Sequence, residues 1–513
     1  MNKLRLTITL TLGIFTLVGF AQKDSLWHLN SSTATEPGID WQKANDFVAE
    51  KEAVEIIVAV IDDGVNVDHP DLQGRIWINP AEVAGNGIDD DGNGYVDDVY
   101  GWNFIGKTKA DNLEKARFLG TEKIRYATMK GSERKKDEGY EAYKTLTKEF
   151  KKEAKKTKRQ AKFIGRMDGY MTALHDKYGD APTLKQARSI RAKKFAGKTG
   201  KLITKKIVKK DPKNFMGIYS QIHEGAEQLV PAATHHYNTA LNERQANVGD
   251  NYSDVTEKYY GDNQVNYHSS GHGTHVAGII AANSSNDFGA KGVCANCKIM
   301  SIRTVPNGDE RDKDVANSIR YAVDNGAKII NMSFGKSMSP QAEVVKSAIK
   351  YAEEKNVLLV HAAGNDASDN DKGGNYPNDG AGASNWLEIG ASSYRKSPMR
   401  LADFSNYGKT QVDLFAPGDE IYSTYTNNGY NPASGTSMAS PVAAGVAGYV
   451  LSYYPTLTAT ELKSILMKSA IAMSDAQQVP GSKELKVPSE ISVSGGIVNV
   501  YKALQLAEEM SKK

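Results

Sequence analysis

The stretch Ile56-Ile57-Val58-Ala59-Val60-Ile61, followed by Asp62-Asp63-Gly64, decides the fold class of this chain. It is an unbroken apolar run, rich in β-branched residues, with charged residues on either side. Such a run is typical of a strand that is buried on both faces of a parallel sheet. Two similar runs follow at residues 327–332 and 357–361. We expect all three to be buried strands.

Helical patterns separate these runs. Residues 314–325 and 340–355 carry apolar side chains at helical spacing, and residues 41–52 resemble a short helix that leads into the first run. Alternating strands and helices predict the α/β class, with a mostly parallel central sheet flanked by helices. Reactive groups of such sheets gather at the carboxyl ends of the strands, so Asp62 is a candidate functional residue. Taken alone, it is equally compatible with a turn before Gly64.

The composition is that of a globular protein. The chain has 513 residues, of which 40% are hydrophobic and 24% charged, and this excludes a fibrous, collagenous or wholly disordered protein. Its two cysteines exclude a disulfide scaffold and a multi-cysteine zinc array. The formal net charge of +3 predicts no acidic partner by itself.

Residues 1–21 are predicted to be a cleaved secretory signal. Lys3 and Arg5 precede an apolar stretch over residues 6–20, and small residues end it near Ala21. A membrane anchor is the alternative, but this stretch of 15 residues is shorter than the roughly 20 that a bilayer core needs. We expect an exported, monomeric protein, in the periplasm or outside the cell.

Two further motifs combine a reactive side chain with small neighbours. His272 lies in Gly271-His272-Gly273-Thr274-His275-Val276-Ala277-Gly278, at the first turn of an apolar helix, where the glycines leave room for a substrate. Ser437 lies in Ser434-Gly435-Thr436-Ser437-Met438-Ala439-Ser440-Pro441, before a helix of Ala, Gly and Val. Pro441 suits a first helical turn, and the serine could merely cap that helix. Zinc is disfavoured at the two histidines because no acidic residue stands between them.

Together with Val60-Ile61-Asp62-Asp63-Gly64, these two motifs resemble the three active-site signatures of subtilisin-like serine peptidases, the subtilase family. The order Asp, His, Ser along the chain also matches. The resemblance covers about residues 27–104 and 267–504. One departure is Asp63, where the family usually has Ser or Thr; a second carboxylate could compete for position or raise the pKa of its neighbour.

The resemblance implies a serine endopeptidase that acts on proteins or peptides. Ser437 would attack the peptide carbonyl, His272 would take its proton, and Asp62 would orient and stabilise the imidazole. Asn365, in Ala362-Ala363-Gly364-Asn365, would donate to the oxyanion beside the Ser437 backbone N–H.

Substrate-binding residues follow from the same resemblance. Ser333-Phe334-Gly335 would form the edge on which an extended peptide pairs main chain to main chain. Gly364 would line the pocket for the side chain that precedes the scissile bond. We expect this pocket to be open and apolar, and cleavage to be broad.

Two other functions stay open. An esterase is expected to carry Gly-x-Ser-x-Gly around its serine, and Ser437 lacks that pattern. A catalytically silent protein on the same fold could instead use a basic region of the chain for docking.

That basic region is predicted at residues 107–262, where the strand–helix alternation stops. Residues 107–210 hold 32 Lys and Arg against 12 Asp and Glu, and residues 133–158 have apolar positions three and four apart. We expect a weakly cored helical subdomain, inserted into a peptidase domain made of residues 22–106 and 263–513. We favour a solvated helical face over binding of nucleic acid or anionic polymer. A third hypothesis is that the insertion covers or narrows the substrate cleft, or assists folding.

Residues 87–98 carry a metal-binding pattern. Oxygen ligands at alternate positions resemble an EF-hand-type loop, with Gly94 allowing the sharp turn; they are Asp89, Asp91, Asn93, the Tyr95 carbonyl and Asp97. Such ligands favour a structural Ca²⁺ ion. The glutamate of position twelve is missing because Tyr100 stands there, so another ligand or water must complete the shell. An acidic turn without metal is the alternative.

Cys294 and Cys297 form a C-x-x-C pattern. Two ligands cannot make a structural zinc site, and a strand expected at residues 298–304 replaces the helix of a redox motif. Export favours a local disulfide, and a free thiol pair is the alternative.

Overall fold

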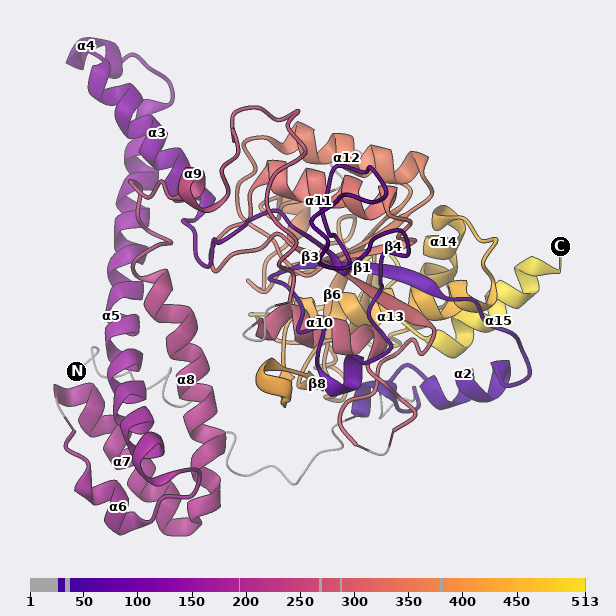
Figure 1. Cartoon of the computed structure of the whole chain (residues 1–513), viewed down its shortest axis with the longest axis horizontal. Helices are drawn as coiled ribbons and strands as arrows, with labels where there is room; N and C mark the ends of the chain where they lie inside the picture. Colours follow the sequence, from indigo (N-terminus) through magenta and orange to yellow (C-terminus); the bar gives the residue numbers. More distant parts are fainter. Residues whose placement is uncertain are drawn as a thin grey trace.

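The computed structural model describes residues 26–32, 37–192, 194–266, 270–286, 288–378 and 382–512, so the expected signal at residues 1–21 lies outside the described residues. A nine-stranded sheet forms the centre, in the order β10-β13-β7-β6-β5-β4-β1-β3-β2 (Figure 1). All neighbouring pairs are parallel except β10 with β13. The strands are β1 (Ile56–Asp62), β2 (Gly101–Asn103), β3 (Cys297–Arg303), β4 (Ile329–Met332), β5 (Leu358–Ala362), β6 (Trp386–Ser392), β7 (Leu414–Pro417), β10 (Ile471–Ala472) and β13 (Gly496–Ile497).

Strand β1 sends alternate side chains into two separate cores, as a strand buried on both faces must. Val58 and Val60 belong to the core under one face, which contains side chains of α2 (Trp41–Val48), α10 (Gly271–Ala281), α13 (Thr436–Tyr453), α14 (Ala459–Ser469) and α15 (Val500–Ser511). Ala59 and Ile61 belong to the core on the other face, under α11 (Asp312–Asp324) and α12 (Ala342–Glu354). The α/β class with helices on both faces of a mostly parallel sheet is therefore confirmed.

Helix α13 begins earlier than the sequence suggested. Its first residue is Thr436, so Pro441 is the sixth residue and lies in the second turn, not the first. A proline there cannot donate to the carbonyl of Ser437, four positions back. The Ser333 hydroxyl donates to that carbonyl instead, at 2.9 Å, and this replaces the missing helical bond.

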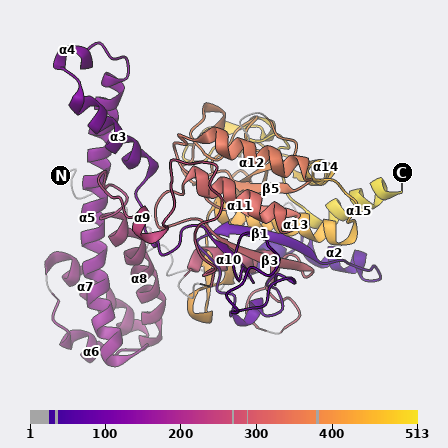
Figure 2. The ribbon, with the colours of Figure 1, turned by 45° about the horizontal axis from the view of Figure 1, so that its top comes forward.

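The helices between β2 and α10 form an elongated arm beside the α/β domain (Figures 1 and 2). Its elements are α3 (Glu114–Thr128), α4 (Gly131–Arg134), α5 (Tyr140–Tyr178), α6 (Leu184–Ser189), α7 (Lys194–Lys210), α8 (Phe215–Ala232) and α9 (Arg244–Asn247). The helix expected over residues 133–158 is interrupted before α5, which then continues for 39 residues.

The arm has a hydrophobic core of its own, whereas the sequence led us to expect weak packing. Met171, Leu174 and Phe215 are fully buried in a cluster to which α5, α7 and α8 contribute. Because β2 pairs parallel with β3, and β3 with β1, the arm leaves the sheet at the same edge where β1 ends in Asp62.

Replacement of Leu174 tests whether the arm is a packed unit. Leu174→Ala should destabilise the arm by about 3 kcal/mol, because it empties a closed core. Hydrogen exchange should quicken in α5 and α8 and stay unchanged in β4 and β5, whereas the exposed Lys177→Ala control leaves all four elements unchanged. Equal acceleration in the sheet would contradict an independent core.

Candidate active site

The candidate site lies where β1 and β4 end side by side. Ile61 of β1 is in register with Met332 of β4, so the next residues, Asp62 and Ser333, occupy neighbouring positions at the carboxyl edge of the sheet. Parallel strands lie about 4.8 Å apart. His272, which is bonded to Asp62, and Ser437, which is bonded to Ser333, therefore lie at the same part of the sheet edge.

His272 is joined directly to Asp62. It is the second residue of α10, and its Nδ1 lies 2.8 Å from Asp62 Oδ1. The Asp62 side chain is 2% exposed, whereas that of His272 is 41% exposed, so the imidazole is open to a substrate. A side chain at Gly273 would place its Cβ 2.1 Å from the Gly64 carbonyl, and glycine is therefore required for this close approach.

Ser437 reaches the same edge through Ser333. Its hydroxyl donates to the Ser333 carbonyl at 3.1 Å, and the Ser333 hydroxyl donates back to the Ser437 carbonyl. The hydrogen-bonded line expected from Asp62 through His272 to Ser437 is thus present in its first half. The second half of that line is not seen among the described residues, because the Ser437 hydroxyl donates to the Ser333 carbonyl.

The charges at the site favour a protonated imidazole. Burial alone would lower the pKa of His272, but the charge and hydrogen bond of Asp62, with a further contribution from Asp63, raise it to about 9. Asp63 does not bind His272. Its carboxylate accepts the Gly273 N–H at 2.8 Å, and burial together with the charge of Asp62 raises the pKa of Asp63 to about 7.

Two nitrogen donors lie close to one small space beside Ser437. Asn365 Oδ1 accepts from the Thr436 N–H at 2.8 Å, and because that backbone group can only donate, the other end of the amide is the donor Nδ2. A Cβ built on Gly435 would lie 3.6 Å from Asn365 Nδ2 and 3.5 Å from the Ser437 nitrogen. The missing side chain of Gly435 leaves this space open.

The segment Ser333–Gly335 has more polar surroundings than the sequence suggested. A Cβ on Gly335 would lie 2.6 Å, and one on Gly364 3.6 Å, from Oδ1 of Asn375. The Asn375 amide in turn donates to the Ala363 carbonyl and to Glu388, at 3.0 and 3.2 Å. Sequence reasoning missed Asn375 because no motif surrounds it.

The acidic loop brings together a different set of carboxylates from the one expected. Asp91, Glu82 and Asp98 each offer an oxygen within 4.8 Å of the others. Asp97 instead accepts the N–H groups of Gly85, Asn86 and Gly87, and Asp89 accepts those of Asn93 and Gly94. Asn93 lies beside the cluster, and its side-chain Nδ2 donates to Asp91 and Asp98. The Tyr95 N–H donates to the side-chain oxygen Oδ1 of Asn93.

One carboxylate oxygen of this acidic cluster is buried and is not paired with a donor among the described residues. This atom is Glu82 Oε2. Burial raises the pKa of Asp98 to about 6, against the hydrogen bond from Tyr321 that lowers it. The donor set is all oxygen and fits a hard cation such as Ca²⁺. A sequence signal existed for Asp98, which directly follows Asp97, whereas none pointed to Glu82.

Cys294 and Cys297 are joined by a disulfide in the structure. It packs against α13, where a Cβ on Gly448 would lie 2.4 Å from Cys297 Sγ. The bridge therefore lies in the core under the sheet, and both cysteines are fully buried.

A carboxylate bonded to an imidazole, a serine at a helix start on the same sheet edge, and two N–H donors beside that serine are the arrangement of a serine hydrolase. Comparison with known proteins narrows the class. Residues 54–490 match the model of the Subtilase family, Peptidase S8, and the chain belongs to that family.

Named relatives are proteases. The chain is 36% identical over 236 residues to thermitase of Thermoactinomyces vulgaris, covering 46% of this chain and 75% of thermitase. It is 37% identical over 269 residues to the cell wall-associated protease of Bacillus subtilis, covering 50% of this chain and 29% of that protein. It also covers 42% of a thermophilic serine proteinase from a Bacillus species, so it spans less than half the length of these last two. A protease structure from Pseudoalteromonas arctica aligns at 29% identity with a TM-score of 0.39, over 46% of this chain and 70% of that one.

The contribution of Asp63 to the site is testable through the pH profile. If His272 acts as a general base, Asp63→Asn should move the acid limb of kcat/KM to lower pH, because a base must be neutral and His272 loses one charge that stabilises its cationic form. The exposed Asp68→Asn control should leave the limb in place. A limb that moves upward, or does not move, would contradict this assignment.

Proposed function

We propose that the chain is a serine endopeptidase that hydrolyses peptide bonds of protein or peptide substrates. The observation that carries this proposal is the 2.8 Å bond from His272 Nδ1 to Asp62, at the edge where Ser437 stands beside the donors of Asn365 and its own N–H. The bond to Asp62 leaves the other ring nitrogen, Nε2, free for proton transfer.

Each residue has a defined step in this proposal. Ser437 Oγ forms a bond to the substrate carbonyl carbon while its proton passes to His272 Nε2, and the carbonyl oxygen becomes an oxyanion held by Asn365 and the Ser437 N–H. As the C–N bond breaks, His272 gives the proton to the leaving amine. Water then adds to the acyl-enzyme by the same route, and Ser437 is regenerated.

The domain organisation and setting belong to the same proposal. Residues 22–106 and 263–513 form the peptidase domain, and residues 107–262 form an insertion. The enzyme works as a monomer after export through the signal at residues 1–21; two of its relatives are named as cell wall-associated and extracellular proteases. Within the described part of the chain, no helix is both long and apolar enough to cross a bilayer. Recovery of the mature protein with an N-terminus at or near Gln22 would support export, and recovery of residues 1–21 intact would oppose it.

Labelling with a fluorophosphonate separates the enzyme from a silent binding protein. The purified chain should take up one label, on Ser437, because only an activated serine attacks such a reagent. Ser437→Ala should take none, whereas Ser440→Ala, three positions further along α13, keeps the labelling. A wild-type chain that takes no label would refute the endopeptidase.

The oxyanion donor is tested by its effect on kcat. Asn365→Leu should lower kcat by about 100- to 1000-fold and change KM little, since the donor acts on charge that develops only in the transition state. The exposed Asn242→Leu serves as the control. A loss confined to KM would assign Asn365 to substrate binding instead.

We also propose a structural Ca²⁺ ion at the acidic loop, held by Glu82, Asp91 and Asp98. The orphaned Glu82 oxygen and the exclusively oxygen donors support it. The expected ligands at Asp89, Asn93, Tyr95 and Asp97 would then shape the loop through their hydrogen bonds. The ion would offset repulsion among three neighbouring carboxylates and would take no part in bond breaking.

Thermal unfolding with and without chelator tests the ion. Saturation at 100 times Kd should stabilise the folded chain by about 2.7 kcal/mol, and Asp91→Asn should remove most of that gain. Asp46→Asn, on the surface of α2, is the control. A wild-type melting temperature that does not respond to Ca²⁺ would exclude the site.

A further inference from the structure

The helical arm is anchored beside the substrate-binding segment by buried charges. Lys336 directly follows Ser333-Phe334-Gly335. Its ammonium lies 3.1 Å from Oε2 of Glu114, the first residue of α3, and 2.8 Å from Asp312. The side chains of Lys336 and Glu114 are 1% and 6% exposed, so water screens this pair little.

Glu114 is itself held from three sides. Its backbone N–H donates to Asp309 at 2.8 Å, and its carboxylate also accepts from Arg117 at 2.6 Å. Arg117 donates in addition to the carbonyls of Asp309 and Glu310. Burial would raise the pKa of Glu114, but Arg117 and Lys336 hold it below its usual value. The carboxylate is therefore charged when the arm is in place.

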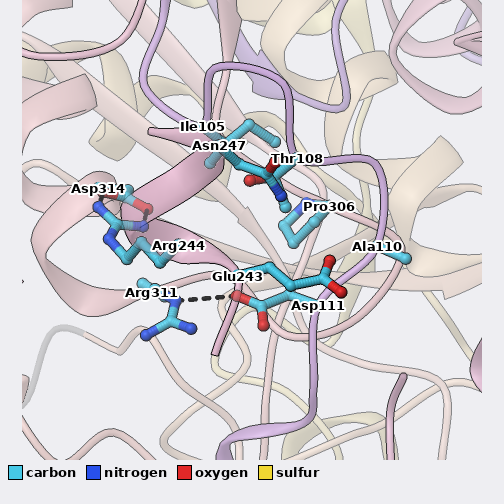
Figure 3. Close-up of a pocket in the computed structure, with 10 residues that line it drawn as sticks. All are labelled: Ile105, Thr108, Ala110, Asp111, Glu243, Arg244, Asn247, Pro306, Arg311 and Asp314. Carbon is cyan, nitrogen blue, oxygen red and sulfur yellow. Dashed lines mark hydrogen bonds and ion pairs between the residues drawn. The ribbon is translucent and has the colours of Figure 1, made fainter. Parts of the chain in front are cut away.

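A second anchor holds the base of the arm where the chain leaves it. Arg244 of α9 donates two hydrogen bonds to Asp314, at 2.8 and 2.7 Å, and Arg311 pairs with Asp111 at 2.9 Å. These groups line a small pocket between the arm and α11 (Figure 3). Two buried anchors make the base of the arm a fixed part of the α/β domain.

The segment Ser333–Lys336 is held at three of its four residues, and Gly335 is exposed. Ser333 is bonded to Ser437, the Phe334 carbonyl accepts from His361 at 2.8 Å, and Lys336 exchanges two backbone hydrogen bonds with Tyr376. Within the described part of the chain, the side chain of Lys336 links this segment to the arm through its ion pair with Glu114. The Lys336 ammonium also donates to the Glu310 carbonyl at 2.8 Å. If the loss of one partner moves this side chain, we expect the adjacent backbone at Gly335 to move with it, next to where a peptide is proposed to pair.

We propose that Glu114 is a positioning residue, through which the helical arm sets the geometry of the substrate-binding segment for long peptides. This inference rests on the proposed function, because it needs Ser333–Gly335 to bind the substrate main chain. The arm then acts on substrate binding from its base, through Lys336, and Glu114 does not touch the reacting atoms.

A comparison of substrates of different length tests this role. Glu114→Gln should lower kcat/KM for a tetrapeptide amide about tenfold or more, since a misplacement of about 1 Å can cost about 100-fold in rate. Its kcat/KM for a single-residue ester, which does not extend along Gly335, should stay within about twofold of wild type. Glu122→Gln, which removes the ion pair with Arg125 on the same helix, is the matched control and should change the kinetics of neither substrate.

Glu114→Asp keeps the buried negative charge but shortens the side chain that contacts Lys336. This variant tests the positioning role if Glu114→Gln does not fold. Fluorophosphonate labelling counts competent active sites in every preparation. If the wild type labels normally but neither Glu114 variant changes the ratio of tetrapeptide to ester activity, the positioning role is wrong and the endopeptidase stands. If the wild type does not label, the proposed function fails first. An equal loss on both substrates would indicate a merely structural role and would also overturn the inference.

Discussion

The bond between Asp62 and His272 depends on how closely α10 approaches the end of β1. No side chain fits at Gly273, because the Gly64 carbonyl occupies that space, and the Asp63 carboxylate holds the Gly273 N–H. Ser437 reaches the same edge by a different route, through its reciprocal bonds with Ser333. The site therefore depends on two contacts at neighbouring strand ends. Gly273 packs against the end of β1, and Ser437 is bonded to Ser333 at the end of β4.

Pro441 shows how a local irregularity serves this edge. In an unbroken helix the Ser437 carbonyl would accept an N–H from position 441, and proline has none to give. The freed carbonyl accepts from Ser333 instead, which links the start of α13 to the segment proposed to bind substrate. The proposed nucleophile and the proposed substrate edge are in this way held by the same pair of residues.

Charges buried between the arm and the α/β domain have a different function from core packing. Burying ions costs free energy that pairing offsets only in part. Our hypothesis is that this network contributes more to a defined geometry than to stability. Lys313 and Lys336 have almost no exposed side-chain surface, and each contacts two carboxylates. This explains how a long helical arm can be attached through a narrow base and still keep a defined position.

The strand at Ile56–Asp62 and the motifs around His272 and Ser437 could be predicted from sequence, because each depends on local patterns of apolar and small residues. Other features depend on residues that are distant in sequence and meet only in the fold. Glu114 and Lys336 are 222 positions apart, and Asn375 lies against glycines from two separate strand ends. The EF-hand-type spacing likewise predicted Asp97 as a ligand, whereas the fold brings its neighbour Asp98 together with Glu82.

Acid quenching during turnover, followed by mass spectrometry of the whole chain, tests the central claim most directly. The account predicts that a slowly deacylating ester leaves one acyl group per molecule, mapped to Ser437, and that its accumulation is lost when His272 is replaced by Ala. Turnover without any acylated Ser437, or acylation that does not depend on His272, would contradict the account.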